Sequence, residues 1–193
     1  MDLPKWLITF VGDIHVSKYP MWVQYKLSQH KLRGDEIQRV LDTVEIGDIL
    51  LRRHDGYLNT YITPGFWSHA GLVISSSETI HSVGEGVIKE NLLDFCRTDS
   101  ICILRIKDNP SSRFSVEKSL AEHAVAKAFE LLGSDYDFKF KSGNSQYYCT
   151  ELVDVCYASL FKEFYEKMVG KTILLPASIK NSGLVETILE IRH

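Results

Sequence analysis

The chain has 193 residues, of which 45% are hydrophobic and 24% charged, and its formal net charge is -3. This length supports one well-buried core and is short for two ordinary domains, so we predict a single domain over residues 1–193. The slightly acidic charge excludes a general polyanion binder, and no nucleic-acid partner is expected.

The N-terminal segment, residues 1–43, is mixed in character. It begins with an apolar stretch of about ten residues that lacks a basic leader and a small-residue cleavage site. Asp13 and His15 interrupt this stretch, so we expect neither a signal peptide nor a membrane span. We therefore expect a cytoplasmic location and no stable membrane insertion. The end of the segment, residues 35–43, has helical apolar spacing behind Asp35 as a possible cap.

Strands dominate the next part of the chain. Gly84, Glu85 and Gly86 predict a tight hairpin between two of them. Because the connections are short, the strands predict a mainly antiparallel sheet or a small barrel. Apolar runs bounded by turn residues place these strands at 49–51, 67–75, 78–83, 87–89 and 101–106.

The second half of the chain changes to helical spacing. An apolar stripe from about Ser115 to Leu132 predicts a packing helix that ends at Gly133. A second, long helix is predicted to open at Cys149, after the loop KSGNSQ, and to continue to about residue 160. Residues 174–183 are predicted to return in extended structure, and residues 185–191 to form a last strand.

Cys149 stands at the predicted N-terminus of the second helix. The unsatisfied backbone N–H groups and the positive end of the helix dipole favour the thiolate, which is the reactive form of cysteine. The alternative is a buried core cysteine, because free cysteine also packs as a small hydrophobe. Cys96, Cys102 and Cys156 lie among apolar residues without a CxxC pair, so we expect four free thiols.

A cysteine nucleophile needs a base, and His69 is the first candidate among seven histidines. It opens an apolar strand next to Ala70 and Gly71, which leave room on its open face. His81 lies in the next predicted strand, at a spacing that returns an antiparallel neighbour to the level of His69. The alternatives are a hydrogen-bonded strand-end histidine and a polar residue on a half-exposed strand. The other five histidines have no such setting.

Metal binding is a rival use of the same side chains. Cys149, His69 and His81 could coordinate zinc, but no paired motif such as HExxH or CxxC is present, and we expect no metal or other cofactor. Glu151 and Asp154 resemble a carboxylate pair for acid chemistry. The simpler interpretation is that Glu151 favours the helix N-terminus by its charge.

The order GDILL, WSHAGL, IHSVGEGV, a helix, YDFKF and YYCTELV resembles a known family. It is similar to the circularly permuted papain-like amidases of the YiiX/YaeF type, which are related to NlpC-type cell-wall peptidases and to lecithin retinol acyltransferase. The resemblance extends from about residue 44 to 183. It implies an α+β fold in which a small antiparallel sheet or barrel packs on the helix that bears the nucleophile.

The resemblance also implies roles for three residues. Cys149 would be the nucleophile, His69 the general base, and His81 the residue that orients it. Several relatives have a carboxylate or an amide where this chain has His81, while the acyltransferase branch has a second histidine. Residues 1–43 have no counterpart. Substrate-lining candidates are the aromatic residues Tyr148, Tyr147 and Trp67.

These features together predict a cysteine hydrolase or acyltransferase that works through a thioester. An amide is the expected target, which makes the protein an amidase or peptidase, and its partner a small peptide or an amino-acid amide. One alternative is a lipid acyl-ester hydrolase or acyltransferase with a lipid substrate. Another is a non-catalytic binding module, because fold does not fix function.

Overall fold

The computed structural model describes residues 30–55, 63–107, 120–141, 143–168 and 170–193, and the backbone of β1 (Ile14–Val16) and β2 (Val23–Tyr25). The chain forms two compact units, residues 1–30 and 31–193. In the first, β1 and β2 pair antiparallel. The prediction of one domain over 1–193, with 1–43 as an extension, stays a prediction.

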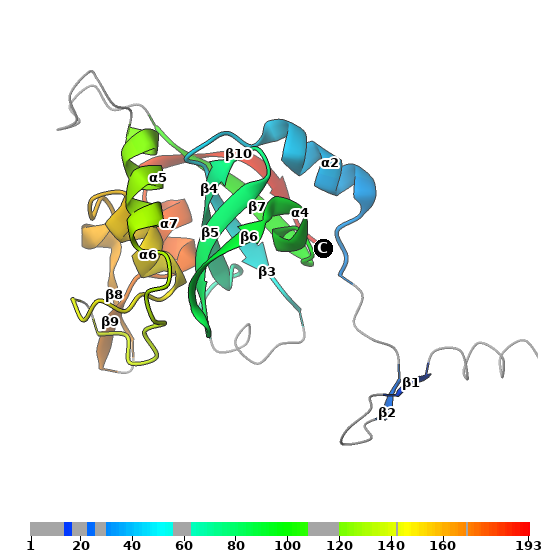
Figure 1. The fold of residues 1–193 in the computed structure, drawn as a ribbon, viewed down its shortest axis with the longest axis horizontal. Coiled ribbons are helices and arrows are strands. Elements are labelled where there is room, and N and C mark those ends of the chain that lie inside the picture. The colour runs from blue at the N-terminus through cyan, green and yellow to red at the C-terminus, as the bar shows by residue number, and fades with distance from the viewer. Residues whose placement is uncertain are drawn as a thin grey trace, which may run out of the picture. The chain divides into compact units, whose positions relative to one another are not determined.

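The second unit is built on a six-stranded antiparallel sheet with the strand order β10-β7-β3-β4-β5-β6. Figure 1 shows the sheet at the centre of this unit. The five predicted strands and the last predicted strand are all present, so the antiparallel α+β prediction is confirmed. Their bounds are β3 (Ile49–Arg53), β4 (His69–Ser75), β5 (Glu78–Val83), β6 (Gly86–Asn91), β7 (Ser100–Ile106) and β10 (Val185–Ile191).

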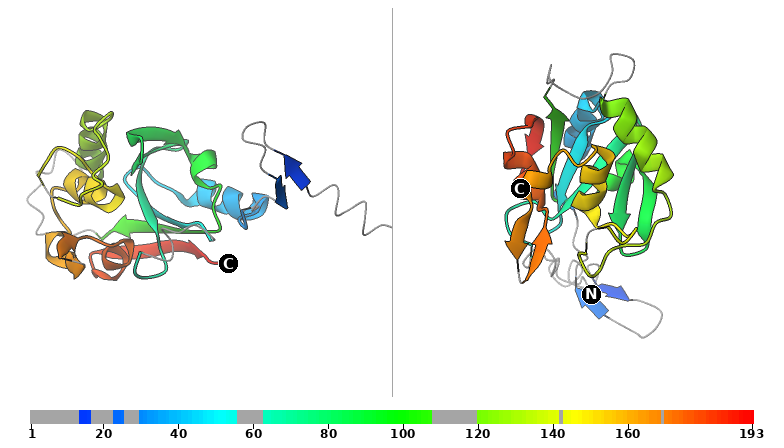
Figure 2. Two further views of the ribbon diagram at one scale, coloured as in Figure 1. Left: turned by 90° about the horizontal axis from the view of Figure 1, so that it is seen from below. Right: turned by 90° about the vertical axis from the view of Figure 1, so that its left-hand side faces the viewer.

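Helices cover both faces of the sheet (Figures 1 and 2). On one face pack α5 (Leu120–Glu130) and α6 (Cys149–Cys156), and on the other α2 (Gly34–Thr43) and α4 (Leu92–Phe95). Alternate residues of the strands β3, β4 and β7 therefore enter different apolar clusters, which explains the continuous apolar runs in the sequence. Among the described residues, no helix has the length and apolar character needed to cross a bilayer.

The helix that opens at Cys149 is shorter than predicted, because it ends at Cys156. Ala158 and Ser159 follow with positive φ angles of 53° and 60°, which an α-helix cannot contain. The Asp154 carboxylate accepts the backbone N–H of Phe161 at 2.7 Å and so holds this turn. Asp154 thus has a structural role here, and the apolar spacing beyond Cys156 reflects packing of a turn.

The predicted extended return over residues 174–183 is wrong in part. It contains the short helix α7 (Pro176–Asn181), and Pro176 occupies its first turn. A proline suits this position because the first turn of a helix has no partner for its N–H groups. The 3-10 helix η1 (Lys162–Phe164) and the small hairpin of β8 (Glu166–Met168) and β9 (Lys171–Ile173) were not predicted.

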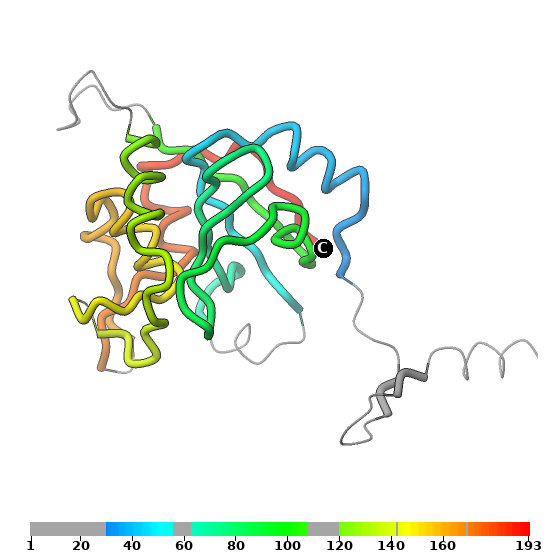
Figure 3. The backbone as a smooth tube through the Cα atoms, in the orientation of Figure 1, coloured from blue at the N-terminus to red at the C-terminus, as the bar shows by residue number. Residues whose placement is uncertain are grey.

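The connection from α5 to α6 is fastened to the β5–β6 hairpin, and Figure 3 traces both. The backbone N–H of Gly133 donates to the carbonyl of Val87 at 2.9 Å, and that of Val87 to Ser134 at 2.8 Å. Further along, the Ser82 hydroxyl donates to the carbonyl of Tyr147 at 2.5 Å. These bonds hold the residues before α6 against the strand pair that contains His81.

The buried Tyr157 ties α6 to the turn before β3, because its hydroxyl donates to the carbonyl of Gly47. The substitution Tyr157→Phe leaves this carbonyl without its donor. We expect the free energy of unfolding in urea to fall by about 1–3 kcal/mol. Tyr147→Phe is the control, since the side chain of Tyr147 is only partly buried against the same core. Equal losses in the two variants would contradict this role of the Tyr157 hydroxyl.

Candidate active site

Two histidines meet on one face of the sheet. In the β4–β5 ladder His81 is opposite Gly71, two residues after His69, and residues two apart on a strand share a face. The Nε2 atom of His69 lies 2.8 Å from the Nδ1 atom of His81. The predicted contact between the two rings is therefore confirmed. It leaves Nδ1 of His69 as the ring nitrogen not engaged by His81.

Gly71 is required by the packing around this pair. A Cβ atom at position 71 would lie 2.9 Å from Cε2 of Phe95 and 3.3 Å from Cβ of His81. The ring centroid of Phe95 lies 5.4 Å from that of His81 and 6.1 Å from that of His69. The space predicted beside His69 is therefore occupied at Gly71 by the side chains of Phe95 and His81. Phe95, at the end of α4, supports both imidazole rings.

Cys149 is the first residue of α6, as predicted, and only 9% of its surface is exposed. The backbone N–H groups of Ala70, the residue that follows His69, and of Thr150 and Cys149 itself lie near enough to its sulfur to act on its pKa. The start of α6 therefore lies against the start of β4, and the two elements are in contact. The fold thus places the sulfur of Cys149 beside the strand end that bears His69.

Burial dominates the ionisation of this site. It raises the pKa of Cys149, although the backbone N–H groups and the charge of Arg52 act in the opposite direction. The N–H groups at the helix N-terminus thus favour the thiolate, as expected, but burial outweighs them and the net shift disfavours it. Burial, Arg52, His81 and His54 hold the pKa of His69 well below its usual 6.5. Burial and Arg52 lower that of His81 to about 3. At neutral pH all three groups are uncharged.

Arg52 and Glu90 surround the histidine pair, and neither was predicted. Arg52 is opposite His69 in the β3–β4 ladder, and its guanidinium carbon lies 4.2 Å from the ring centroid of Phe95. Its Nη1 atom is 3.2 Å from Oε2 of Glu90. The same oxygen is 3.2 Å from Nε2 of His81, an ion-pair distance without the alignment of a hydrogen bond.

The alternation of side chains along the strands could have located Arg52 and Glu90 from the sequence. Ile88 is opposite His81, so Glu90, two positions further, lies on the same face of the sheet. The predicted strand 87–89 stopped one residue short of Glu90, and the predicted strand 49–51 stopped one residue short of Arg52. Extending both strands by the alternation of side chains places Arg52 and Glu90 on the face that carries the histidines.

The predicted substrate-lining aromatics are largely buried. Trp67 and Tyr148 are each 2% exposed, and Tyr147 is partly buried. The hydroxyl of Tyr148 accepts the backbone N–H of Leu174 at 3.0 Å. A surface hollow of about 310 Å³ lies between η1 and α7, and Cys149 is not among the residues that line it. The lining role of the three aromatics stays a prediction.

The histidine pair does not fit a shared metal ion. Two nitrogen ligands of tetrahedral zinc, each about 2.0–2.1 Å from the metal, are about 3.4 Å apart. Nε2 of His69 and Nδ1 of His81 are 2.8 Å apart, a hydrogen-bond distance. The rival interpretation of Cys149, His69 and His81 as zinc ligands is therefore not supported at these nitrogens.

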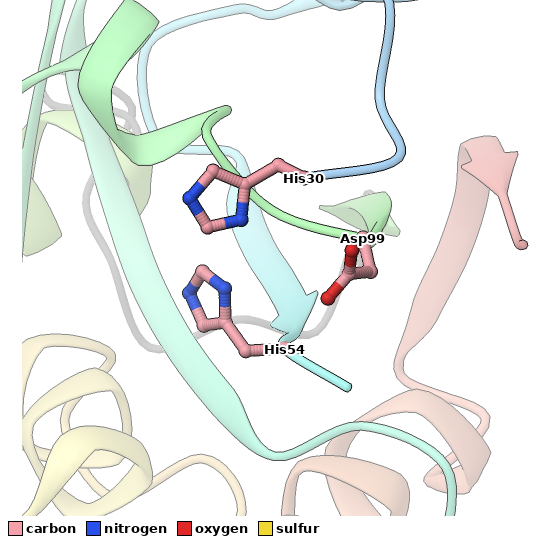
Figure 4. A group of neighbouring side chains, drawn as sticks. All are labelled: His30, His54 and Asp99. Carbon is pink, nitrogen blue, oxygen red and sulfur yellow. The ribbon is translucent and has the colours of Figure 1, made fainter. Parts of the chain in front are cut away.

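Figure 4 shows a second set of side chains of metal-binding type, His30, His54 and Asp99. His30 belongs to the first unit, so the second unit supplies two of these ligands, fewer than the three protein ligands of a catalytic zinc site. Asp99 has a structural role. Its Oδ1 accepts the backbone N–H of Lys31 at 3.1 Å, and its Oδ2 that of Asp55 at 2.6 Å. We assign no metal to this set.

Comparisons with known proteins agree with this architecture. None of the curated proteins matches the chain. Among solved structures, the metalloprotein yiiX from Escherichia coli O157:H7 matches with a TM-score of 0.62 and 18% identity, over 78% of this chain and 99% of that one. The model of the permuted papain-like amidase enzymes, YaeF/YiiX, C92 family, matches residues 43–189. The chain therefore belongs to the permuted papain-like amidase family.

Proposed function

We propose that the protein is a cysteine amidase or peptidase in which Cys149 is the nucleophile, His69 the general base and His81 the residue that orients His69. One observation supports this most strongly. The sulfur of Cys149 lies near the backbone N–H of Ala70, next to a histidine whose Nε2 lies 2.8 Å from Nδ1 of His81. Family membership supports an amidase-type activity, and the roles of the three residues are the proposal.

Because Cys149 and His69 are both neutral at rest, the proposed first step includes the transfer of a proton between them. As the sulfur of Cys149 attacks the substrate carbonyl, its proton passes to Nδ1 of His69. The backbone N–H of Cys149 contributes to an oxyanion hole for the tetrahedral intermediate. His69 then returns the proton to the leaving amine, and a thioester to Cys149 remains. A water molecule, deprotonated by His69, attacks the thioester, releases the acid and restores the thiol.

The substrate class is an amide of a small peptide or of an amino acid. Tyr147, Tyr148 and Trp67 are proposed to lie along the path to Cys149, which requires side-chain movement because two of them are buried.

The alternatives are a lipid acyl ester, turned over by the same thioester chemistry, and a binding module without turnover. A cytoplasmic location belongs to the same proposal. The proposal contains no metal step, and the 2.8 Å between Nε2 of His69 and Nδ1 of His81 does not fit an ion shared by these two nitrogens.

Replacing the nucleophile tests the role of Cys149. We expect Cys149→Ala and Cys149→Ser to abolish turnover of acyl-amide substrates with little effect on the fold. The wild type should form a covalent acyl adduct on Cys149 that mass spectrometry detects. Cys156→Ala, which alters a buried thiol of the same helix, is the matched control and should retain activity. Substantial turnover by either Cys149 variant would remove Cys149 as the nucleophile, and turnover of lipid esters alone would favour the alternative.

The raised pKa of Cys149 predicts how its alkylation depends on pH. Because only the thiolate reacts well, the rate of modification by iodoacetamide should rise about tenfold per pH unit between about pH 7 and 9. Peptide mapping by mass spectrometry assigns the modified residue. Burial raises the pKa of Cys96, Cys102 and Cys156 to about 12, so these should react much more slowly. A rate that is constant from about pH 6 to 8 would indicate a thiolate–imidazolium pair instead.

The lowered pKa of His69 predicts the acid limb of the pH–rate profile. Protonated His69 cannot accept the proton of Cys149, so activity is lost as the pH falls through the pKa of His69. That pKa is well below 6.5, hence kcat/KM should be constant from about pH 6.5 to 8. Circular dichroism at each pH separates this effect from acid unfolding. An acid limb centred at or above pH 6.5 in folded protein contradicts a neutral, buried His69.

A further inference from the structure

We propose that Glu90 is a positioning residue that fixes the tautomers of His81 and His69, so that Nδ1 of His69 is the unprotonated nitrogen. This inference rests on the proposed function, in which that nitrogen accepts the proton of Cys149. It adds the carboxylate of Glu90 to the three residues Cys149, His69 and His81 that the sequence analysis named.

The carboxylate of Glu90 is held where it can accept from His81. Its Oε2 atom lies 3.2 Å from Nε2 of His81 and 3.2 Å from Nη1 of Arg52. Arg52 is itself held by Phe95, whose carbonyl accepts from Nη1 at 3.3 Å and whose ring lies under the guanidinium. The side chain of His81 is only 1% exposed, so solvent does not compete for its Nε2 atom.

The contact between the two neutral rings permits two proton arrangements. A hydrogen bond between His69 Nε2 and His81 Nδ1 needs one donor and one acceptor, and either ring can supply the proton. An ionised carboxylate only accepts, so Glu90 favours a proton on Nε2 of His81. Nδ1 of His81 is then the acceptor, and the proton of His69 lies on its Nε2.

The opposite arrangement would disable the base. If His81 carried its proton on Nδ1, His69 would accept at Nε2 and carry its own proton on Nδ1. The nitrogen required to take the proton of Cys149 would then be occupied. The Glu90–His81 contact is poorly aligned, and catalytic hydrogen bonds often tighten only in the complex with substrate. The arrangement therefore predicts an effect of Glu90 on kcat more than on KM.

Nitrogen NMR of the histidine side chains reads the tautomers directly. We expect the wild type to carry the proton on Nε2 in both His69 and His81, measured with and without Cys149→Ala. Glu90→Ala should produce a mixture of tautomers at both rings, and Glu90→Gln should keep the wild-type pattern through its amide oxygen. Glu78→Ala is the matched control, because Glu78 forms an ion pair with Lys89 in the same hairpin. A proton on Nδ1 of His81 in the wild type overturns the proposal, even if Glu90→Ala does not fold.

Kinetics then distinguish positioning from a structural role. Glu90→Ala should lower kcat about tenfold or more with little change in KM, as for other carboxylates that orient a functional histidine, and Glu90→Gln should recover part of the loss. Unchanged kcat in Glu90→Ala, with wild-type turnover present, overturns the proposal and leaves the proposed function intact. Absence of turnover in the wild type overturns the proposed function, while the tautomer measurement still tests Glu90.

Discussion

The register between β4 and β5 is the constraint on which the candidate site depends. It sets His81 opposite Gly71 and so brings Nε2 of His69 within 2.8 Å of Nδ1 of His81. A shift by one residue would turn every side chain of β5 to the other face and separate the rings. The register is well fixed, because β4 is paired on both sides and both faces of the sheet are buried. Gly71 and Phe95 then leave the two rings little freedom.

Burial and charge act against each other in this site. Burial keeps Cys149, His69 and His81 neutral, so opposite charges on sulfur and imidazole arise only when a proton moves. The backbone N–H groups around the sulfur and the guanidinium of Arg52 favour the thiolate at that moment. The thiol and the two imidazoles are therefore uncharged at rest, and preorganised dipoles lie where negative charge develops.

The sequence pattern predicted what depends on local rules and missed what depends on packing. Apolar runs with turn residues located all six strands of the main sheet, and the Gly–Ser–Asn loop located the start of the helix at Cys149. It missed the end of this helix, because the turn after Cys156 is held by the Asp154 carboxylate, which accepts the N–H of Phe161, and apolar spacing does not reveal such a side-chain bond. It also gave the wrong direction for the pKa of Cys149, since the extent of burial is a tertiary property. Glu90 was missed because the predicted strand 87–89 ended one residue before it, and strand boundaries are the least reliable part of such a prediction.

The bonds between the β5–β6 hairpin and the connection to α6 have a further consequence. Gly133, Ser134 and Tyr147, which precede the cysteine, are fastened to the two strands that carry His81 and Glu90. Fraying of the edge strand β6 would therefore disturb the histidine pair and the approach to Cys149 in one step. Proteins open in such cooperative sub-global units at a lower free energy than complete unfolding requires. Loss of function on mild heating should then precede melting of the strands β3, β7 and β10, which lie on the other side of β4.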